Sequence, residues 1–210
     1  MAEKKEKKIC WGKADKMLYA VIWYTFRWLF IAVYRMRIEG AENLPKTGRV
    51  VLCGNHSSFV DPILMIASVR RELSFMAKKS LFEKFFLSWL LPRMGAFPVD
   101  RAGVHLGAVR TALSVLEREG VVGIFPEGTR SKNGRMGRAL EGVGMIAAKG
   151  KAPIMPVAIV TEGKRPQLFK RTVIRYGTLI DVPAEDTKEA YSRVTGEAMA
   201  QISAMLEKGL

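Results

Sequence analysis

The residues best suited to chemistry in this chain lie in one short turn. Residues 55–61 read Asn-His-Ser-Ser-Phe-Val-Asp, which places His56 and Asp61 five positions apart. The preceding run, 49–54, is β-branched and apolar and predicts a buried strand. Asp61-Pro62 ahead of an apolar run predicts a helix start, with Asp61 as N-cap and Pro62 at the first helical position. We therefore expect His56 at the carboxyl end of a strand, where open α/β sheets bind ligands.

A histidine held by a carboxylate can act as a general base on a hydroxyl. If the loop closes onto the helix N-terminus, Asp61 can bond to Nδ1 of His56, which fixes the tautomer and raises the basicity of Nε2. The alternative is a histidine hydrogen-bonded to its own loop, with Asp61 serving only as a cap. The turn by itself leaves both interpretations open.

Three further segments also contain a short apolar run that predicts a strand. Residues 97–101, Phe-Pro-Val-Asp-Arg, place Arg101 directly after a short apolar run. A second buried strand is predicted at 121–125, and it leads into Pro-Glu-Gly-Thr-Arg at 126–130. A third apolar run, 152–160, is bracketed by prolines, which indicates an edge strand or a strand-entry position.

Taken together, these segments resemble the four ordered sequence blocks of the glycerolipid acyltransferase family. The blocks are Asn55-His56-x4-Asp61, Phe97-Pro98-Val99-Asp100-Arg101, Phe125-Pro126-Glu127-Gly128-Thr129-Arg130 and Pro153-Ile154-Met155-Pro156-Val157. Their order and spacing make the match specific, and it covers about residues 35–180. Within the family, the likeness is to bacterial 1-acylglycerol-3-phosphate acyltransferases, which make phosphatidic acid.

The resemblance implies a reaction. An acyl thioester, either acyl-CoA or acyl-ACP (acyl carrier protein), would donate a fatty acyl group to the sn-2 hydroxyl of 1-acylglycerol-3-phosphate (lysophosphatidic acid) in phospholipid synthesis. His56 would take the proton of that hydroxyl and Asp61 would orient His56, with no covalent intermediate. The thioester is a co-substrate, and no bound cofactor is expected.

The resemblance also implies a set of substrate-binding residues. These are Arg101, Glu127, Gly128, Thr129 and Arg130. Arginine grips a phosphate through two parallel hydrogen bonds, so Arg101 and Arg130 are the expected phosphate ligands. Glu127 would position Arg130 or bind an acceptor hydroxyl. The alternative for each arginine is a structural salt bridge, to Asp100 or to Glu127.

One position departs from the family pattern. Many relatives carry a lysine just before a glycine in the helix that follows the Glu127 block, whereas this chain has Glu141-Gly142. A carboxylate at that position is unsuited to binding an anion. Arg135 and Arg138 are the nearby substitutes.

Composition narrows the class of partner. Net charge is +14 over 210 residues, so nucleic acid, an anionic membrane surface or a phosphorylated substrate would suit the chain electrostatically. Only Cys10 and Cys53 are present, and Cys53 falls in a predicted buried strand, which favours a reducing compartment over a disulfide. No cysteine or histidine spacing resembles a zinc site, and only two histidines occur. No metal site is expected.

The N-terminal segment is basic and then apolar. Residues 17–34 are almost wholly apolar or aromatic, with Arg27 as the one charge. We interpret this run as an interfacial helix in which Trp23, Arg27 and Trp28 associate with a membrane and the polar stripe faces head groups or the domain. A helix in the domain core and a spanning helix are the alternatives. Arg27 would be costly at the bilayer centre, and positive charge flanks both ends.

The fold prediction is a single α/β domain with a mixed, largely parallel sheet flanked by helices. It would occupy residues 38–210, with residues 1–37 as the membrane-interface helical segment. Strands are expected at 49–54, 73–77, 95–98, 121–125, 153–160 and 172–179. Helices are expected at 62–70, 80–91, 103–118, 138–149 and 185–208.

These expectations place the protein at the cytoplasmic face of the cell membrane, as a monotopic or peripheral enzyme. Within the enzyme class, another lysolipid acceptor is the main alternative. A basic non-catalytic domain that binds lipid or nucleic acid would explain the charge, but it would leave His56 and Asp61 without a purpose. Nucleic acid is therefore not expected as a partner.

Overall fold

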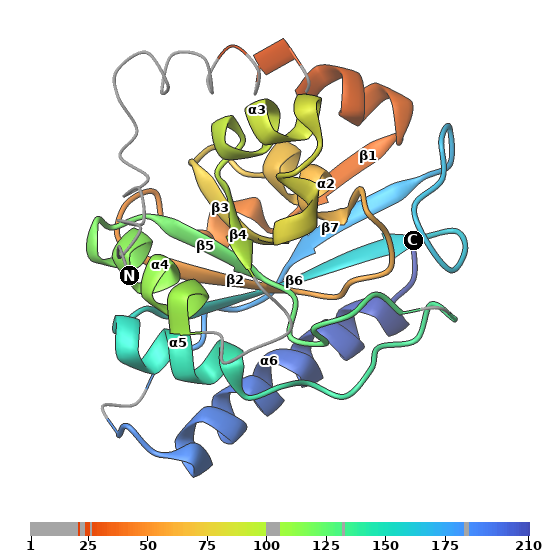
Figure 1. Cartoon of the computed structure of the whole chain (residues 1–210). Coiled ribbons are helices and arrows are strands. Elements are labelled where there is room, and N and C mark those ends of the chain that lie inside the picture. Colours follow the sequence, from red (N-terminus) through yellow and green to blue (C-terminus); the bar gives the residue numbers. More distant parts are fainter. Residues whose placement is uncertain (1–20, 22–23, 26, 100–105, 132, 183–184) are drawn as a thin grey trace.

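The fold is an α/β domain built on one sheet, as a computed structural model shows (Figure 1). The model describes residues 21, 24–25, 27–99, 106–131, 133–182 and 185–210. The strands are β1 (Met36–Glu39), β2 (Val50–Gly54), β3 (Leu73–Lys78), β4 (Ala96–Val99), β5 (Val121–Ile124), β6 (Ile154–Thr161) and β7 (Thr172–Tyr176). The helices are α2 (Asp61–Ser68), α3 (Phe85–Arg93), α4 (Leu106–Glu117), α5 (Gly142–Gly150) and α6 (Lys188–Glu207), with short 3-10 turns η1 (Ala41–Asn43) and η2 (Lys79–Leu81).

The sheet has the strand order β1-β7-β6-β2-β5-β3-β4. Neighbouring strands pair in parallel except for β6 and β7, which are antiparallel. The prediction of a mixed, largely parallel sheet is therefore confirmed. Its consequence for function is that β2, β3, β5 and β6 all end at the same edge.

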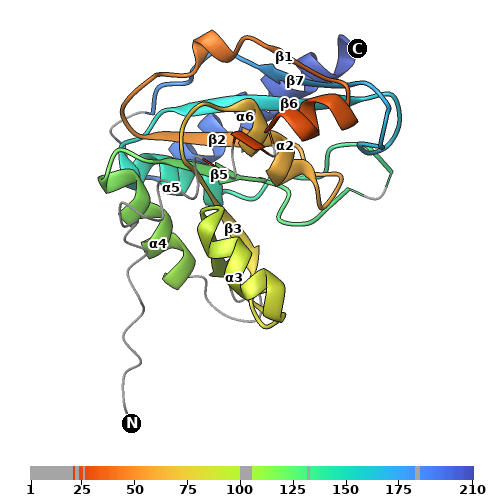
Figure 2. The same ribbon diagram turned by 90° about the horizontal axis from the view of Figure 1, so that it is seen from above.

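Helices cover both faces of this sheet (Figures 1 and 2). Side chains alternate along β2, so Val51 and Cys53 pack with α4, α5 and α6, while Val50 and Leu52 pack with α2 on the other face. All four are fully buried. An apolar strand covered on both faces explains why β2 reads as a continuous hydrophobic run.

Several predicted elements differ from the structure. β1 was not predicted, and it begins at Met36, so the sheet takes in the last two residues of the predicted N-terminal segment. The single helix predicted at 80–91 is wrong, because η2 and α3 are separate there. The helix predicted from 138 begins only at Gly142. The edge-strand interpretation of the prolines is also wrong, since β6 lies inside the sheet; Pro153 does directly precede the strand.

The N-terminal helix packs on the domain through Arg27. Residues 27–33 are helical, and the Arg27 guanidinium donates a hydrogen bond to the Ala67 carbonyl in the last turn of α2. A cation is favoured there because helix carbonyls concentrate negative charge at a C-terminus. Arg27 thus faces the domain, whereas Trp28 is exposed and Trp23 lies outside the described residues. Within the described part of the chain, no helix combines the length and apolarity needed to cross a bilayer.

Candidate active site

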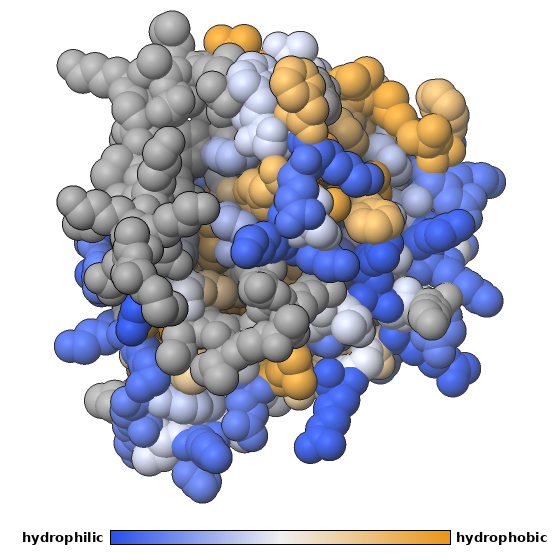
Figure 3. Space-filling model, viewed as in Figure 1, coloured by the Kyte–Doolittle hydropathy of each residue, from blue (hydrophilic) through white to orange (hydrophobic). Residues whose placement is uncertain are grey.

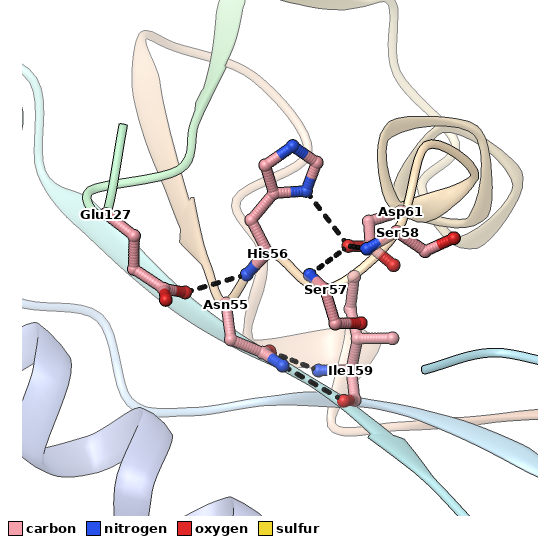
Figure 4. Close-up of polar contacts among 7 residues, drawn as sticks. All are labelled: Asn55, His56, Ser57, Ser58, Asp61, Glu127 and Ile159. Carbon is pink, nitrogen blue, oxygen red and sulfur yellow. Dashed lines mark hydrogen bonds and ion pairs between the residues drawn. The ribbon is translucent and has the colours of Figure 1, made fainter. Parts of the chain in front are cut away.

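The site is built where β2 and β5 end beside each other. Cys53 of β2 pairs with Ile124 of β5, so the turn after β2 and the loop after β5 emerge together. Asn55 anchors the turn to β6: its side-chain amide donates to the Ile159 carbonyl at 3.1 Å, and the Ile159 N–H donates back at 2.7 Å. The backbone just before the histidine is therefore fixed to the sheet (Figure 4).

The histidine and the carboxylate are in contact, which was one of the two interpretations of the turn. Nδ1 of His56 lies 2.9 Å from Oδ2 of Asp61. Because a carboxylate only accepts, Nδ1 is the donor, and in the neutral imidazole Nε2 is then the nitrogen with the lone pair. In Figure 4, Nε2 points away from Asp61. Of the pair, only the histidine is in part exposed: its side chain is 14% exposed, whereas the aspartate side chain is fully buried.

Asp61 is not the helix N-cap that the sequence predicted. Val60 holds that position, Asp61 is the first helical residue, and the cap has no side-chain hydrogen bond. Instead, the carboxylate turns back to accept the Ser57 and Ser58 N–H groups at 2.6 Å each, both on Oδ2. These donors stabilise its negative charge and fix its direction. Oδ1 is buried and has no hydrogen-bond partner among the described residues.

Aromatic rings support the imidazole from behind. The His56 ring stacks on Phe125 with centroids 4.2 Å apart, and Phe125 stacks on Phe75 at 5.7 Å. Gly123 makes room for this stack, because a Cβ there would lie 2.1 Å from the Phe75 ring. The ring orientation is thus set by packing as well as by Asp61.

Glu127 holds the backbone of the site together, a role that the sequence did not reveal. One carboxylate oxygen accepts the His56 N–H at 2.9 Å, and the other accepts the Gly137 N–H at 2.8 Å. The expected partner was Arg130 or an acceptor hydroxyl, and neither of these bonds involves Arg130. Glu127 therefore ties the loop after β5 to the histidine itself.

Arg130 lies at the open side of the site. Its guanidinium carbon lies 3.5 Å from the centroid of the Phe59 ring, and both residues are exposed. The next residue, Ser131, donates its N–H to the His56 carbonyl at 2.8 Å, so the arginine directly precedes a residue anchored to the turn. No ion pair between Arg130 and Glu127 is present in the described residues. Arg101 lies outside them.

The two predicted helpers of Arg130 differ in their setting. Gly128 adopts a left-handed φ of 66° and donates its N–H to the Phe125 carbonyl at 3.1 Å, which closes a tight turn. That N–H is thus already used within the loop. Thr129 is exposed beside it.

Glu141, the position that departs from the family pattern, faces another element. Its carboxylate accepts a hydrogen bond from the Ser192 hydroxyl of α6 at 3.1 Å. Arg135 and Arg138, the nearby substitutes for the missing lysine, are both exposed. The departure therefore adds a contact between the start of α5 and α6.

In the part of the chain that the structure describes, no group of three His, Cys, Asp or Glu residues is placed to hold a metal ion. Cys53 is buried directly before the turn, and burial raises the pKa of its thiol to about 12. It is therefore a packing residue with an unreactive thiol.

An α/β sheet whose strand ends present a histidine–aspartate pair and an exposed arginine has the form of an enzyme that activates a hydroxyl on an anionic substrate. Comparison with known proteins agrees. The family model described as Acyltransferase matches residues 35–160. The chain belongs to this acyltransferase family.

Two sequence relatives carry the name of an acyltransferase. The chain is 34% identical over 138 residues to a 1-acyl-sn-glycerol-3-phosphate acyltransferase of Bacillus subtilis, covering 65% of this chain and 68% of that protein. It is 30% identical over 158 residues to a chloroplastic 1-acyl-sn-glycerol-3-phosphate acyltransferase of Arabidopsis thaliana, covering 72% of this chain but only 44% of that protein. The chain thus spans less than half the length of this plant relative.

The fold is shared with a crystal structure. The 1-acyl-sn-glycerophosphate acyltransferase of Thermotoga maritima superimposes with a TM-score of 0.69 at 24% identity, over 91% of this chain and 79% of that chain. This likeness confirms the predicted α/β fold.

Proposed function

We propose that the protein transfers a fatty acyl group from an acyl thioester to the sn-2 hydroxyl of 1-acylglycerol-3-phosphate, giving phosphatidic acid. The observation that carries the proposal is the 2.9 Å contact between His56 Nδ1 and Asp61 Oδ2, which leaves Nε2 as the base. The names of the relatives supply the acceptor and the reaction class.

The proposed reaction needs no covalent enzyme intermediate. Nε2 of His56 takes the acceptor hydroxyl proton while the oxygen attacks the thioester carbonyl carbon. Collapse of the tetrahedral intermediate breaks the C–S bond and releases the thiolate, which takes the proton back from the imidazolium. Asp61 stabilises the imidazolium between these steps, as a buried carboxylate beside a histidine does.

Charge supports the proposed substrates. Arg130 is exposed beside the His56 turn, where a bidentate guanidinium would hold the acceptor phosphate; Arg101 is proposed as a second ligand. The net charge of +14 favours coenzyme A and acyl carrier protein alike as the donor carrier. No bound cofactor is proposed, and the site of action is the cytoplasmic face of the membrane, in monotopic or peripheral attachment.

The test is acyl transfer from labelled palmitoyl thioesters, on coenzyme A and on carrier protein, to lysophosphatidic acid in mixed micelles. Wild type and His56→Ala are assayed in parallel. Labelled phosphatidic acid from wild type alone is the expected result, and the productive thioester identifies the donor. Wild type that acylates no lysolipid with either donor would contradict the proposal.

A further inference from the structure

Exposed apolar side chains gather at the edge of the sheet that carries His56. Phe59, Phe85, Leu140, Leu168 and Phe169 are each more than half exposed. Each lies in a segment that follows the carboxyl end of β2, β3, β5 or β6, and these four strands run parallel. The amino edge of the same strands has no comparable set among the large exposed hydrophobic residues of the described chain.

The connection between β6 and β7, residues 162–171, is the most distinctive part of this edge. In its second half Leu168 is 58% exposed and Phe169 is 69% exposed. Phe169 also adopts a φ of 63°, a left-handed conformation that an aromatic residue rarely takes. Four exposed basic residues flank the apolar pair: Lys164, Arg165, Lys170 and Arg171. Of these, Lys170 forms an ion pair with Glu162 at 3.5 Å.

The hairpin is joined to the N-terminal helix. The Phe169 N–H donates to the Val33 carbonyl, at the end of that helix, at 2.7 Å. On the helix, Trp28 is 66% exposed and Leu29 is 54% exposed. Figure 3 shows apolar atoms gathered over the region where Figure 1 places this helix, with hydrophilic atoms beside them. Helix and hairpin are thus neighbours, and each exposes large apolar side chains.

We propose that hairpin 162–171 is a membrane contact, in which Leu168 and Phe169 enter the interface of an anionic bilayer and the flanking cations bind its head groups. Apolar side chains framed by lysine and arginine are the pattern that binds such an interface. An acidic partner protein would satisfy the cations, but it would not require two large exposed apolar residues between them. The inference adds a second contact to the N-terminal helix, and it rests on the proposed function for the lipid nature of the surface.

This contact would orient the enzyme. β6 runs parallel to β2, so the hairpin and the His56 turn lie at one edge of the sheet. A protein attached by the hairpin and the helix would therefore turn its site toward the bilayer. A lysolipid acceptor could then reach His56 with its acyl chain still in the membrane.

The test is cosedimentation of the full chain with vesicles of phosphatidylcholine, with and without phosphatidylglycerol. Leu168→Ser with Phe169→Asn removes the two exposed apolar side chains. Asparagine is chosen at position 169 because it tolerates the positive φ found there. We expect the affinity of this variant for the mixed vesicles to fall about tenfold. Lys164→Gln with Arg165→Gln should lower binding to the anionic vesicles by about fivefold for each charge removed.

The matched control is Lys46→Gln with Lys151→Gln. It removes the same charge from two exposed residues that precede β2 and β6, at the opposite edge of the sheet. Screening confines head-group attraction to about 10 Å, so binding should stay at the wild-type level. Wild-type binding by both hairpin variants, or an equal loss in the control, would overturn the inference.

Acyl transfer in detergent micelles is measured on the same samples. Hairpin-dependent vesicle binding by an inactive wild type would support the membrane contact and contradict the proposed reaction. If wild type is active but the hairpin variants bind vesicles as wild type does, the membrane contact alone would be overturned.

Discussion

The side chains of His56 and Arg130 come from two segments that are bonded to each other at one edge of the sheet, but the two side chains are held differently. His56 is gripped at its ring by Asp61, at its N–H by Glu127 and at its carbonyl by Ser131. Arg130 is exposed and rests on an exposed phenylalanine. The difference fits the proposed roles: a proton-transfer group must be aligned closely, whereas an arginine that binds a phosphate can adjust its position to it.

Removing the base should have the largest effect. His56→Ala should lower kcat by about 10²- to 10⁴-fold, because no other group would accept the hydroxyl proton at that position. Steady-state kinetics with lysophosphatidic acid would measure this, and thermal unfolding would check the fold. A near-normal kcat in a folded variant would break the assignment of chemistry to the turn.

Removing Arg130, the proposed phosphate ligand, should change the acceptor KM and leave kcat nearly unchanged. Arg130→Ala should raise the acceptor KM by about 10- to 100-fold with little change in kcat, because a hydrogen bond to a charged group is lost. Lys151→Ala, at the opposite edge of the sheet, is the matched loss of an exposed cation. An unchanged KM for Arg130→Ala would remove Arg130 from the binding site.

A variant of Glu127 would show whether this residue fixes the backbone of the site or binds the substrate. In Glu127→Gln, the amide nitrogen would face the N–H of His56 or Gly137, so one of the two bonds is lost. We expect kcat to fall about tenfold through misplacement of His56, with acceptor KM unchanged. The free energy of unfolding should drop by about 1.5–3 kcal/mol. A rise in KM at unchanged stability would instead make Glu127 a substrate ligand.

Removing the Phe59 ring that stacks on Arg130 should have the smallest effect on the kinetics. Phe59→Leu keeps an apolar side chain but removes the ring face below the guanidinium. A cation–π contact at an exposed site contributes about 0.5–1 kcal/mol, so the acceptor KM should rise about two- to fivefold. Titration of the acceptor at saturating thioester would measure this. A change in kcat of similar size would show that Phe59 also supports the histidine turn.

The sequence predicted those features that depend on neighbouring residues. A strand, a turn and a helix start lie within residues 49–62, so local geometry offered the contact between His56 and Asp61 as one of two interpretations, although Asp61 is not the N-cap. Continuous apolar runs likewise indicated β2, β5 and β6, because buried parallel strands have no polar face.

Features that depend on distant pairing could not be predicted. β1 has four residues and no fully buried side chain, so only its pairing with β7 defines it as a strand. Glu127 resembled a substrate ligand because nothing nearby in sequence shows that β5 ends beside His56. The irregular course up to Gly142 depends in part on the bond from the Gly137 N–H to that same carboxylate.

The most direct test of the division between the two regions is a double-mutant cycle of Asp61→Asn and Arg130→Ala, with kcat and acceptor KM measured for all four proteins. Asp61→Asn should lower kcat and Arg130→Ala should raise KM, with effects on kcat/KM that add to within about 0.5 kcal/mol. A larger coupling, or two single variants that change the same parameter, would contradict the account.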